Sequence, residues 1–338
     1  MSRAAGTTLY IALCFSSTIQ AHHSIIAHYD PGDVREITGT LVDVTWANPH
    51  TILVFSVRDE QGELETWRAE AGAINTLNRN GISREAFQVG APITVIGPVS
   101  RFGRPAMIAA VAVTSGNEYA LFPALANSLD QELPSESTIT SAAGYEITFT
   151  EAPDLFRVWT PIDFPATAIR PQALPLTEDA LASMDTYDAI DDDLAADCVP
   201  AGMPSMLDQP YPVEFIDRDD RIVMRLEEWN GVRTIYMNDT APDGGRGTIY
   251  GHSKGSWDGE TLVIETSGID YPYYNDAGVP MTPEMVVIER YSISSDQRRM
   301  DWTATIEDPN VFTEPVSFGG WAVWAPDIAI REFGCVAE

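Results

Sequence analysis

Histidines concentrate at the start of the chain, where His22, His23, His28 and His50 account for four of the five. Cleavage after Ala21 would place a new α-amino group beside the His22 imidazole, and these two nitrogens can chelate one metal ion. His23 would lie next to them, and the His50 imidazole could complete the site. Nitrogen ligands of this kind suit copper or zinc. The alternative is that His22 and His23 are simply polar residues and that His50 is a turn residue bonded to backbone.

A second set of chemically capable residues lies in the C-terminal half. In the strand predicted at residues 284–293, Glu289 shares a face with apolar residues, and an inward carboxylate must be paired or raised in pKa. Arg225 and Arg233 are its possible partners, and His252 lies in a turn beside the same sheet. Glu289, Arg233 and His252 together could form a catalytic acid/base or anion-binding set in a cavity. The alternative is that Glu289 faces solvent or forms a structural ion pair.

A ligand held in this half would contact Arg225, Glu332 and Trp257. In a final strand predicted at residues 328–333, Glu332 shares a face with two isoleucines and would also point inward. The chain has no Gly-rich phosphate loop, no G-x-S-x-G nucleophile elbow and no C-x-x-C pair. Three common classes of enzyme are therefore not expected.

Residues 1–21 are predicted to be a signal peptide. Arg3 supplies a positive start, residues 9–15 a short apolar run, and Ala21 the small residue that a cleavage site requires. The apolar run is too short to serve as a permanent transmembrane anchor. We therefore expect an exported protein, either periplasmic or secreted.

Cleavage would remove Cys14 and leave Cys198 and Cys335. An even pair of cysteines in an exported protein favours a disulfide, which would join the two ends of the C-terminal domain. Two unlinked buried thiols are the alternative.

The charge balance excludes some partners. The 338 residues include 20 basic and 50 acidic side chains, for a formal net charge of −30. Nucleic acids and anionic membranes require clustered cations, so neither is expected as a partner. The acid excess is typical of a hydrated surface on a salt-tolerant exported protein.

The elements that would position these residues are mainly strands. Residues 22–120 predict a small domain of five strands with a helix between the third and fourth, the order of an OB-like barrel. Residues 121–197 predict an acidic, proline-containing connector with one strand at 145–150 and a short helix at 178–184. The strands of the first domain are predicted at 35–46, 51–57, 64–69, 93–97 and 107–113, and its helix at 73–80.

Residues 198–338 predict a second β-domain of nine sequential antiparallel strands. Little helix and regular hairpin turns indicate a lipocalin-like β-barrel, which can enclose one small ligand. The strands are predicted at 212–216, 221–227, 233–237, 248–252, 261–266, 284–293, 300–306, 316–324 and 328–333.

Several motifs carry a resemblance to a known group of proteins. They are AHHSIIAHY at 21–29, WANPH at 46–50, CVPAGMPSMLDQPYP at 198–212, GHSKGSWDGETLVIET at 251–266, VIERY at 287–291 and IEDPNVFTEP at 306–315. With these motifs the chain resembles an uncharacterised family of exported two-domain proteins of Gram-negative bacteria. The resemblance implies export, a two-part layout and a cysteine near each end of the second domain. It implies no reaction and no catalytic residue.

Two functions of different class follow. The first is an exported small-molecule-binding or accessory protein, with a small hydrophobic or amphipathic ligand in a pocket lined by Trp, Met and aliphatic side chains. The second is a cofactor-free lyase, isomerase or hydrolase acting on an apolar small molecule. The first is preferred because no recognisable catalytic constellation is present. A barrel filled solid by side chains would count against the first, and a catalytic set that does not converge would count against the second.

Overall fold

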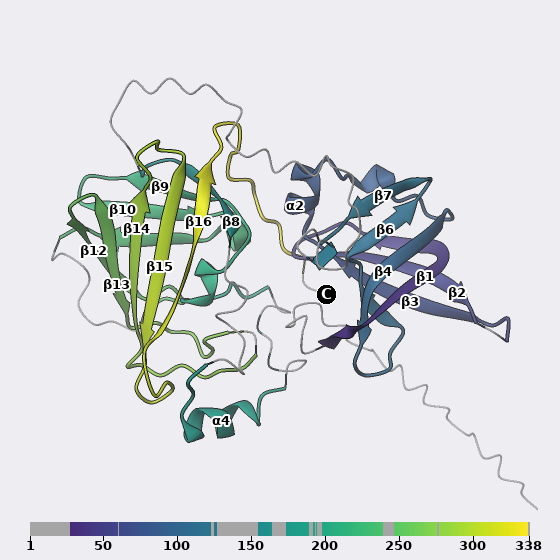
Figure 1. Cartoon of the computed structure of the whole chain (residues 1–338), viewed down its shortest axis with the longest axis horizontal. Coiled ribbons are helices and arrows are strands. Elements are labelled where there is room, and N and C mark those ends of the chain that lie inside the picture. The colour runs from purple at the N-terminus through teal and green to yellow at the C-terminus, as the bar shows by residue number, and fades with distance from the viewer. Residues whose placement is uncertain are drawn as a thin grey trace, which may run out of the picture.

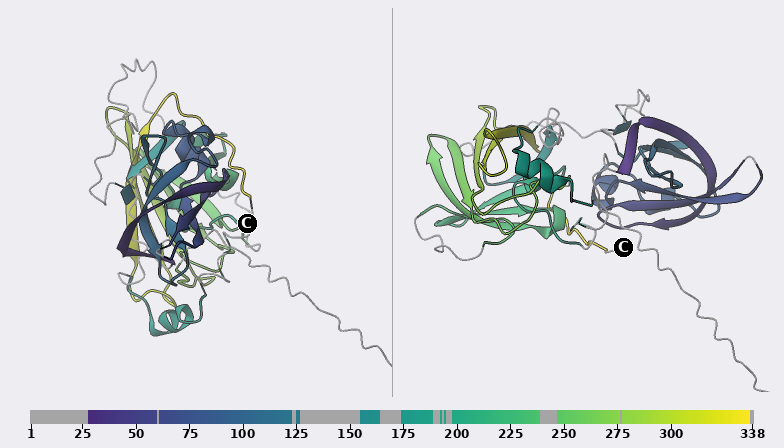
Figure 2. Two further views of the ribbon diagram at one scale, coloured as in Figure 1. Left: turned by 90° about the vertical axis from the view of Figure 1, so that its right-hand side faces the viewer. Right: turned by 90° about the horizontal axis from the view of Figure 1, so that it is seen from below.

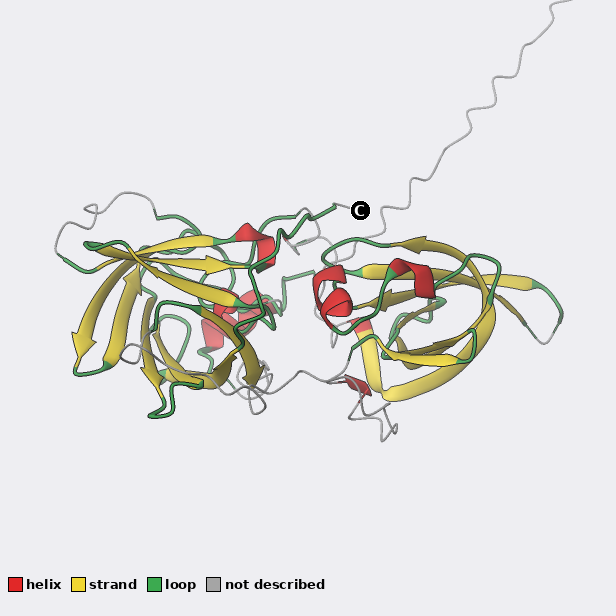
Figure 3. Ribbon diagram, turned by 90° about the horizontal axis from the view of Figure 1, so that it is seen from above, coloured by secondary structure: helices red, strands yellow, loops and turns green. Residues whose placement is uncertain are grey.

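The computed structural model of the chain describes residues 28–59, 61–122, 125–126, 155–163, 174–188, 192, 194, 198–238, 247–275 and 277–336. These residues form two β-barrels that lie side by side (Figure 1). Strands dominate both barrels and the helices are short (Figure 3). The predicted mainly β class is confirmed. The predicted leader, His22, His23 and the strand at 145–150 lie outside the described residues.

The N-terminal barrel is a closed ring of five strands in the order β1-β2-β3-β5-β4, with β4 pairing back to β1. Helix α2 lies between β3 and β4, so the predicted OB-like barrel is confirmed. Two further strands, β6 and β7, extend the sheet beyond β4. The bounds are β1 Tyr29–Thr45, β2 Thr51–Arg58, β3 Leu64–Ala71, α2 Ile74–Arg79, β4 Pro92–Ser100, β5 Ala106–Ile108, β6 Val111–Thr114 and β7 Asn117–Ala120, with a 3-10 turn at Arg84–Ala86.

Strand β1 closes the ring because it is long enough to pair on both sides. Its first part pairs with β4 and its last part with β2, and the register shifts between Leu41 and Asp43. At Gly39 a Cβ would lie 2.5 Å from the Ser56 carbonyl oxygen and 2.9 Å from the Phe55 ring. Only glycine allows this close approach between β1 and β2.

The strand predicted at 107–113 is in fact two strands. Met107 in β5 pairs with the far end of β4, whereas Val111 in β6 pairs near its middle. Ala109 and Ala110 between them are fully buried. The whole segment is therefore one apolar run, and nothing in its sequence indicates that a strand ends at Ile108 and another begins at Val111.

The C-terminal barrel is closed by nine strands in the order β10-β11-β12-β13-β14-β15-β16-β8-β9. The predicted barrel is confirmed, although the strand predicted at 248–252 lies instead at His252–Asp258. Neighbouring strands are antiparallel except for the parallel pair β11 and β12. The bounds are β8 Val158–Asp163, β9 Val213–Asp217, β10 Arg221–Leu226, β11 Val232–Tyr236, β12 His252–Asp258, β13 Thr261–Ser267, β14 Val286–Ile293, β15 Arg299–Glu307 and β16 Val316–Trp324, with 3-10 turns at Ser205–Leu207 and Glu228–Asn230.

The strand predicted at 328–333 is wrong, because those residues form no strand. The barrel is closed instead by β8, which comes from the segment predicted as connector and pairs with both β16 and β9. Trp159 in β8 is fully buried, and its indole N–H donates to the Leu155 carbonyl at 2.9 Å. The helix predicted at 178–184 in this segment is present: α4 spans Glu178–Met184, with the Thr177 hydroxyl capping its first turn.

The chain after β16 runs to the N-terminal barrel, where Cys335 forms an isolated bridge with Asn48. The Val336 N–H donates to the Asn48 carbonyl at 3.1 Å. The predicted disulfide between Cys198 and Cys335 is present, with Cα atoms 6.0 Å apart. The tail, residues 325–336, therefore lies between the two barrels (Figures 1 and 2). Every helix in the described part of the chain is too short or too polar to cross a membrane.

Candidate functional site

A buried ion pair crosses the interior of the C-terminal barrel. The Arg233 guanidinium on β11 donates to both oxygens of the Glu289 carboxylate on β14, Nη1 to Oε2 at 2.9 Å and Nη2 to Oε1 at 2.6 Å. Both side chains are almost fully buried. The sequence prediction that Arg233 partners an inward Glu289 is thus matched by the geometry.

The other donors of Arg233 are also engaged. Nε donates to the Ser253 hydroxyl at 2.9 Å, Nη2 donates to the Thr266 hydroxyl at 2.6 Å, and Nη1 lies 3.9 Å from the Met224 sulfur. A guanidinium has five N–H groups, so this set accounts for all of them. Arg233 and Glu289 thus form a brace inside the barrel, which joins β11 to β14 and is bonded to β12 and β13.

Tyr291 completes the network by donating its hydroxyl to Glu289 Oε2 at 2.8 Å. Burial, reinforced by the Glu289 charge, raises the pKa of Tyr291 well above 10. Burial lowers the pKa of Arg233, but the adjacent Glu289 charge outweighs burial and leaves that pKa raised. Arg233 and Tyr291 therefore keep their protons at neutral pH.

His252 begins strand β12 and so does not lie in the predicted turn, and it does not join this network. It is the residue before Ser253 on β12, and neighbouring residues of a strand point to opposite faces. Because the fully buried Ser253 faces Arg233 inside the barrel, His252 faces outward, where it is partly exposed. The catalytic set of Glu289, Arg233 and His252 is therefore not assembled.

The three predicted ligand-binding residues are also dispersed. Arg225 points outward from β10 and pairs with Glu214 at 2.8 Å. Glu332 is exposed, because the strand that would have turned it inward does not exist. Trp257 is 47% exposed and borders an open hollow at the barrel end that holds Asp217. No common pocket collects these three side chains.

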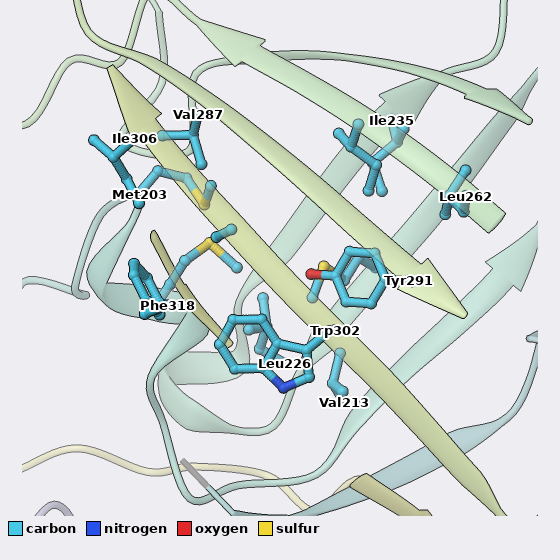
Figure 4. Close-up of a cluster of buried hydrophobic side chains, with 14 of the residues drawn as sticks. Met203, Val213, Leu226, Ile235, Leu262, Val287, Tyr291, Trp302, Ile306 and Phe318 are labelled. Carbon is cyan, nitrogen blue, oxygen red and sulfur yellow. The ribbon is translucent and has the colours of Figure 1, made fainter. Parts of the chain in front are cut away.

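A small cavity lies at the opposite end of the barrel, the mouth that faces the N-terminal domain. Its volume is about 40 Å³, room for roughly three water molecules at about 10–15 Å³ each. The walls are mainly apolar, with Tyr291 and Trp302 meeting Leu226 and Val213 there (Figure 4). Three flexible methionines, Met206, Met224 and Met300, also line it.

Glu228 is the one charged side chain among the residues that line this cavity. It is partly buried, and burial raises the pKa of its carboxyl from 4.5 to about 8. A carboxyl with such a pKa is mostly protonated at neutral pH. The sequence analysis missed Glu228, because it lies just past the end of β10, where strand alternation no longer indicates direction.

The segment around Glu228 is held in place by contacts with two other parts of the chain, helix α2 and the tail. Glu227 is fully buried and accepts hydrogen bonds from Asn75, Arg79 and the Arg331 N–H. The Asn230 side chain both donates to and accepts from the Phe333 backbone, at 2.9 and 2.8 Å. Asn75 and Arg79 belong to the N-terminal domain and the other two contacts to the tail, so the mouth of the barrel is built at the domain interface.

His50 in the N-terminal barrel faces a buried carboxylate. Its Nδ1 lies 3.3 Å from Glu70 Oε1 and 3.3 Å from the Ala71 carbonyl oxygen. The Tyr29 hydroxyl donates to the other oxygen of Glu70 at 3.4 Å. Within the described ranges no group of three or more His, Cys, Asp and Glu side chains could hold a metal ion. The predicted site with His22 and His23 extends outside those ranges.

Residues 11–108 match a family of unknown function, DUF6152. The match covers most of the N-terminal barrel, including His50 and Glu70, and ends with β5. It agrees with the resemblance of the N-terminal part to an uncharacterised family, and it leaves the C-terminal motifs without a counterpart. No curated protein matches the chain.

Proposed function

We propose that the protein is an exported, periplasmic small-molecule-binding or accessory protein whose ligand enters the mouth of the C-terminal barrel. The observation that carries the proposal is the cavity at this mouth, where apolar walls surround a single ionisable side chain, Glu228. Ligand sites in proteins typically combine an apolar lining with a few polar groups. Closed barrels of this size hold such sites at their ends.

The cavity limits the ligand to a small molecule. The Arg233–Glu289 brace fills the middle of the barrel, so the site cannot extend through it. A ligand larger than a few waters requires Met206, Met224 or Met300 to change rotamer. Methionine side chains suit this role because they are unbranched and have three rotatable bonds.

A catalytic function has less support. The acid/base set predicted for the barrel lacks His252, and the donors of Arg233 are already engaged by Glu289, Ser253 and Thr266. A group whose hydrogen bonds are all made within the protein has none left for a substrate. The binding function needs no such group.

Filling the cavity tests the binding proposal. Ala322 on β16 is buried and lines the cavity, so Ala322→Leu should block a ligand. Val232→Leu is the control, because Val232 is 57% exposed on the outside of the same barrel. In calorimetric titrations with 1-hexanol, we expect wild type and Val232→Leu to bind and Ala322→Leu to bind at least about tenfold more weakly. Equal binding by all three proteins, or none by wild type, would contradict the proposal.

Export is supported by the Cys198–Cys335 disulfide, because disulfides persist in oxidising compartments. Its test is the mass of protein recovered from the periplasm. We expect a chain that begins at His22. Recovery of the full-length chain from the cytoplasm alone would contradict export.

A copper or zinc site at His22, His23 and His50 is a further part of the proposal. Metal-bound histidines commonly use one ring nitrogen to bond a carboxylate or carbonyl, and His50 Nδ1 faces Glu70 and Ala71 in this way. We expect native mass spectrometry to find one metal ion per chain in wild type and in the His252→Ala control. His50→Ala should lose the ion. A metal-free wild type would contradict the site.

A further inference from the structure

We infer that the ligand of the C-terminal barrel is a small organic cation, an apolar body that carries one ammonium group, and that Glu228 is the ion-pair partner of this group. The inference rests on the proposed function, since it names the ligand class of the same cavity. Three features of the mouth support it: the partners of its carboxylates, the composition of its walls and its backbone conformation. The net charge of the chain agrees with them.

The first feature is that Glu228 differs from the other buried carboxylates of the barrel. Glu289 is bonded by Arg233 and Tyr291, and Glu227 by side chains of the N-terminal domain. For Glu228 no described residue forms a hydrogen bond with the carboxyl, and burial alone shifts its pKa. Glu228 is only partly buried and lines the cavity, so its carboxyl is available to pair with a donor on a ligand, whereas the carboxylates of Glu227 and Glu289 are already engaged within the protein.

The second feature is the rest of the lining. Apart from Glu228, the cavity walls carry no charge, so nothing there would neutralise an anion. Trp302, Tyr211 and Tyr291 present aromatic rings, and aromatic faces attract ammonium groups. The formal net charge of −30 favours the approach of cations over anions as well.

The third feature is the backbone that carries Glu228. Trp229 and Asn230 have φ angles of 55° and 54°, in the left-handed region that residues other than glycine seldom adopt. Such strain persists where surrounding contacts impose it, often at ligand sites. Here Asn230 is fixed to Phe333 and Glu227 to Arg79, so the backbone that carries Glu228 is held in place at the mouth.

The groups around Glu228 define how binding depends on pH. The Glu228 charge acts on two titratable side chains, Tyr211 and Tyr250. The charges of Glu227 and Arg79 act on Tyr211 as well. Burial raises the pKa of Tyr250 to about 12 and that of Tyr211 well above 10, so both stay neutral below pH 9. Glu227 is already paired with Arg79. Glu228, with a pKa of about 8, is therefore the group near the ligand that titrates close to pH 8.

Binding of an ammonium group would then release the proton of Glu228. As long as the free carboxyl is protonated and the amine is charged, affinity for the amine should rise up to about tenfold per pH unit. The rise should end near pH 8, where Glu228 ionises without a ligand. An alcohol of the same length should show no such rise.

The experiment compares 1-hexylamine, 1-hexanol and hexanoate by calorimetric titration of the full chain. Wild type should bind the amine at least about tenfold more tightly than the alcohol at pH 8, and hexanoate most weakly. Glu228→Gln should lose this advantage and its pH dependence while binding hexanol as wild type does. Glu265→Gln, an exposed change on β13 with the same effect on net charge, should behave as wild type.

The outcomes separate the two proposals. If hexanol binds but the amine binds no better, or if Glu228→Gln leaves the preference intact, the inference about the cation is wrong and the binding function stands. If none of the three probes binds wild type, the binding function itself is wrong. If Glu265→Gln loses the preference as fully as Glu228→Gln does, the preference comes from net charge and not from Glu228.

Discussion

Removing Glu289 should destabilise the protein strongly. In Glu289→Ala the Arg233 guanidinium would stay buried, at 2% exposure, while losing two hydrogen bonds of 2.9 and 2.6 Å and its counter-charge. Breaking a buried pair by removing one partner typically costs about 3–5 kcal/mol. For a domain of this size each kcal/mol lowers the melting temperature by about 2–4 °C, so the expected loss is about 6–20 °C. Urea and thermal unfolding followed by circular dichroism measure both quantities.

The next residue on the same strand supplies the control. Arg290 points outward and pairs with Asp258 at 2.7 Å, with side chains 47% and 70% exposed. An exposed pair contributes about 0–1 kcal/mol, so Arg290→Ala should change the free energy of unfolding by no more than that. Replacing both Arg233 and Glu289 by Met should recover most of the loss, because no unpaired charge then remains. If Glu289→Ala and Arg290→Ala change the free energy of unfolding equally, the Arg233–Glu289 pair does not stabilise the barrel. A catalytic role for Glu289 would then again be the better explanation of its position.

Two further predictions concern stability. Below pH 4.5 Glu228 is protonated in both the folded and the unfolded chain. Between pH 4.5 and about 8 the unfolded chain releases a proton that the folded chain keeps. Relative to Glu228→Gln, the free energy of unfolding of wild type should thus fall as pH rises through this window, by at most about 1.4 kcal/mol per unit. Urea unfolding at several pH values measures this difference, and the same pH dependence in both proteins would contradict the burial of Glu228. The double variant Cys198→Ser, Cys335→Ser opens a loop of 137 residues, and the chain-entropy model predicts a loss of about 5 kcal/mol in the free energy of unfolding. A double variant as stable as wild type would show that the disulfide adds nothing to stability.

Local patterns predicted most of the strands, but they missed the break between β5 and β6, misplaced the strand predicted at 248–252 and indicated the wrong segment to complete the C-terminal barrel. The strand at Val316–Trp324 has the predicted bounds because its alternation is regular. Residues 328–333 also alternate, but the place beside β16 is taken by β8, whose Trp159 fills the barrel core. Which of two segments completes a sheet depends on tertiary packing, and the local pattern of neither segment contains that information.

The same distinction applies to the site. Strand parity placed Glu289 inside the barrel, because parity depends on the strand alone. The sequence offered both Arg225 and Arg233 as its partner, and only the structure distinguishes them. Parity could not supply Ser253 and Thr266, which reach Arg233 from β12 and β13. His252 was chosen for its chemistry, but the register of β12 turns it outward.

Two neighbouring acids, Glu227 and Glu228, have opposite surroundings because the chain reverses direction between β10 and β11. Glu227 turns toward the N-terminal domain and pairs with Arg79, whereas Glu228 turns toward the cavity. The left-handed residues Trp229 and Asn230 make this reversal within one short turn, and the tail fixes it at Phe333. A movement of Glu228 toward a ligand therefore has to pass through the contacts that join the two domains. The contacts of the domain interface thus also position the mouth of the barrel, and under the proposed function the N-terminal domain would help to hold the binding site.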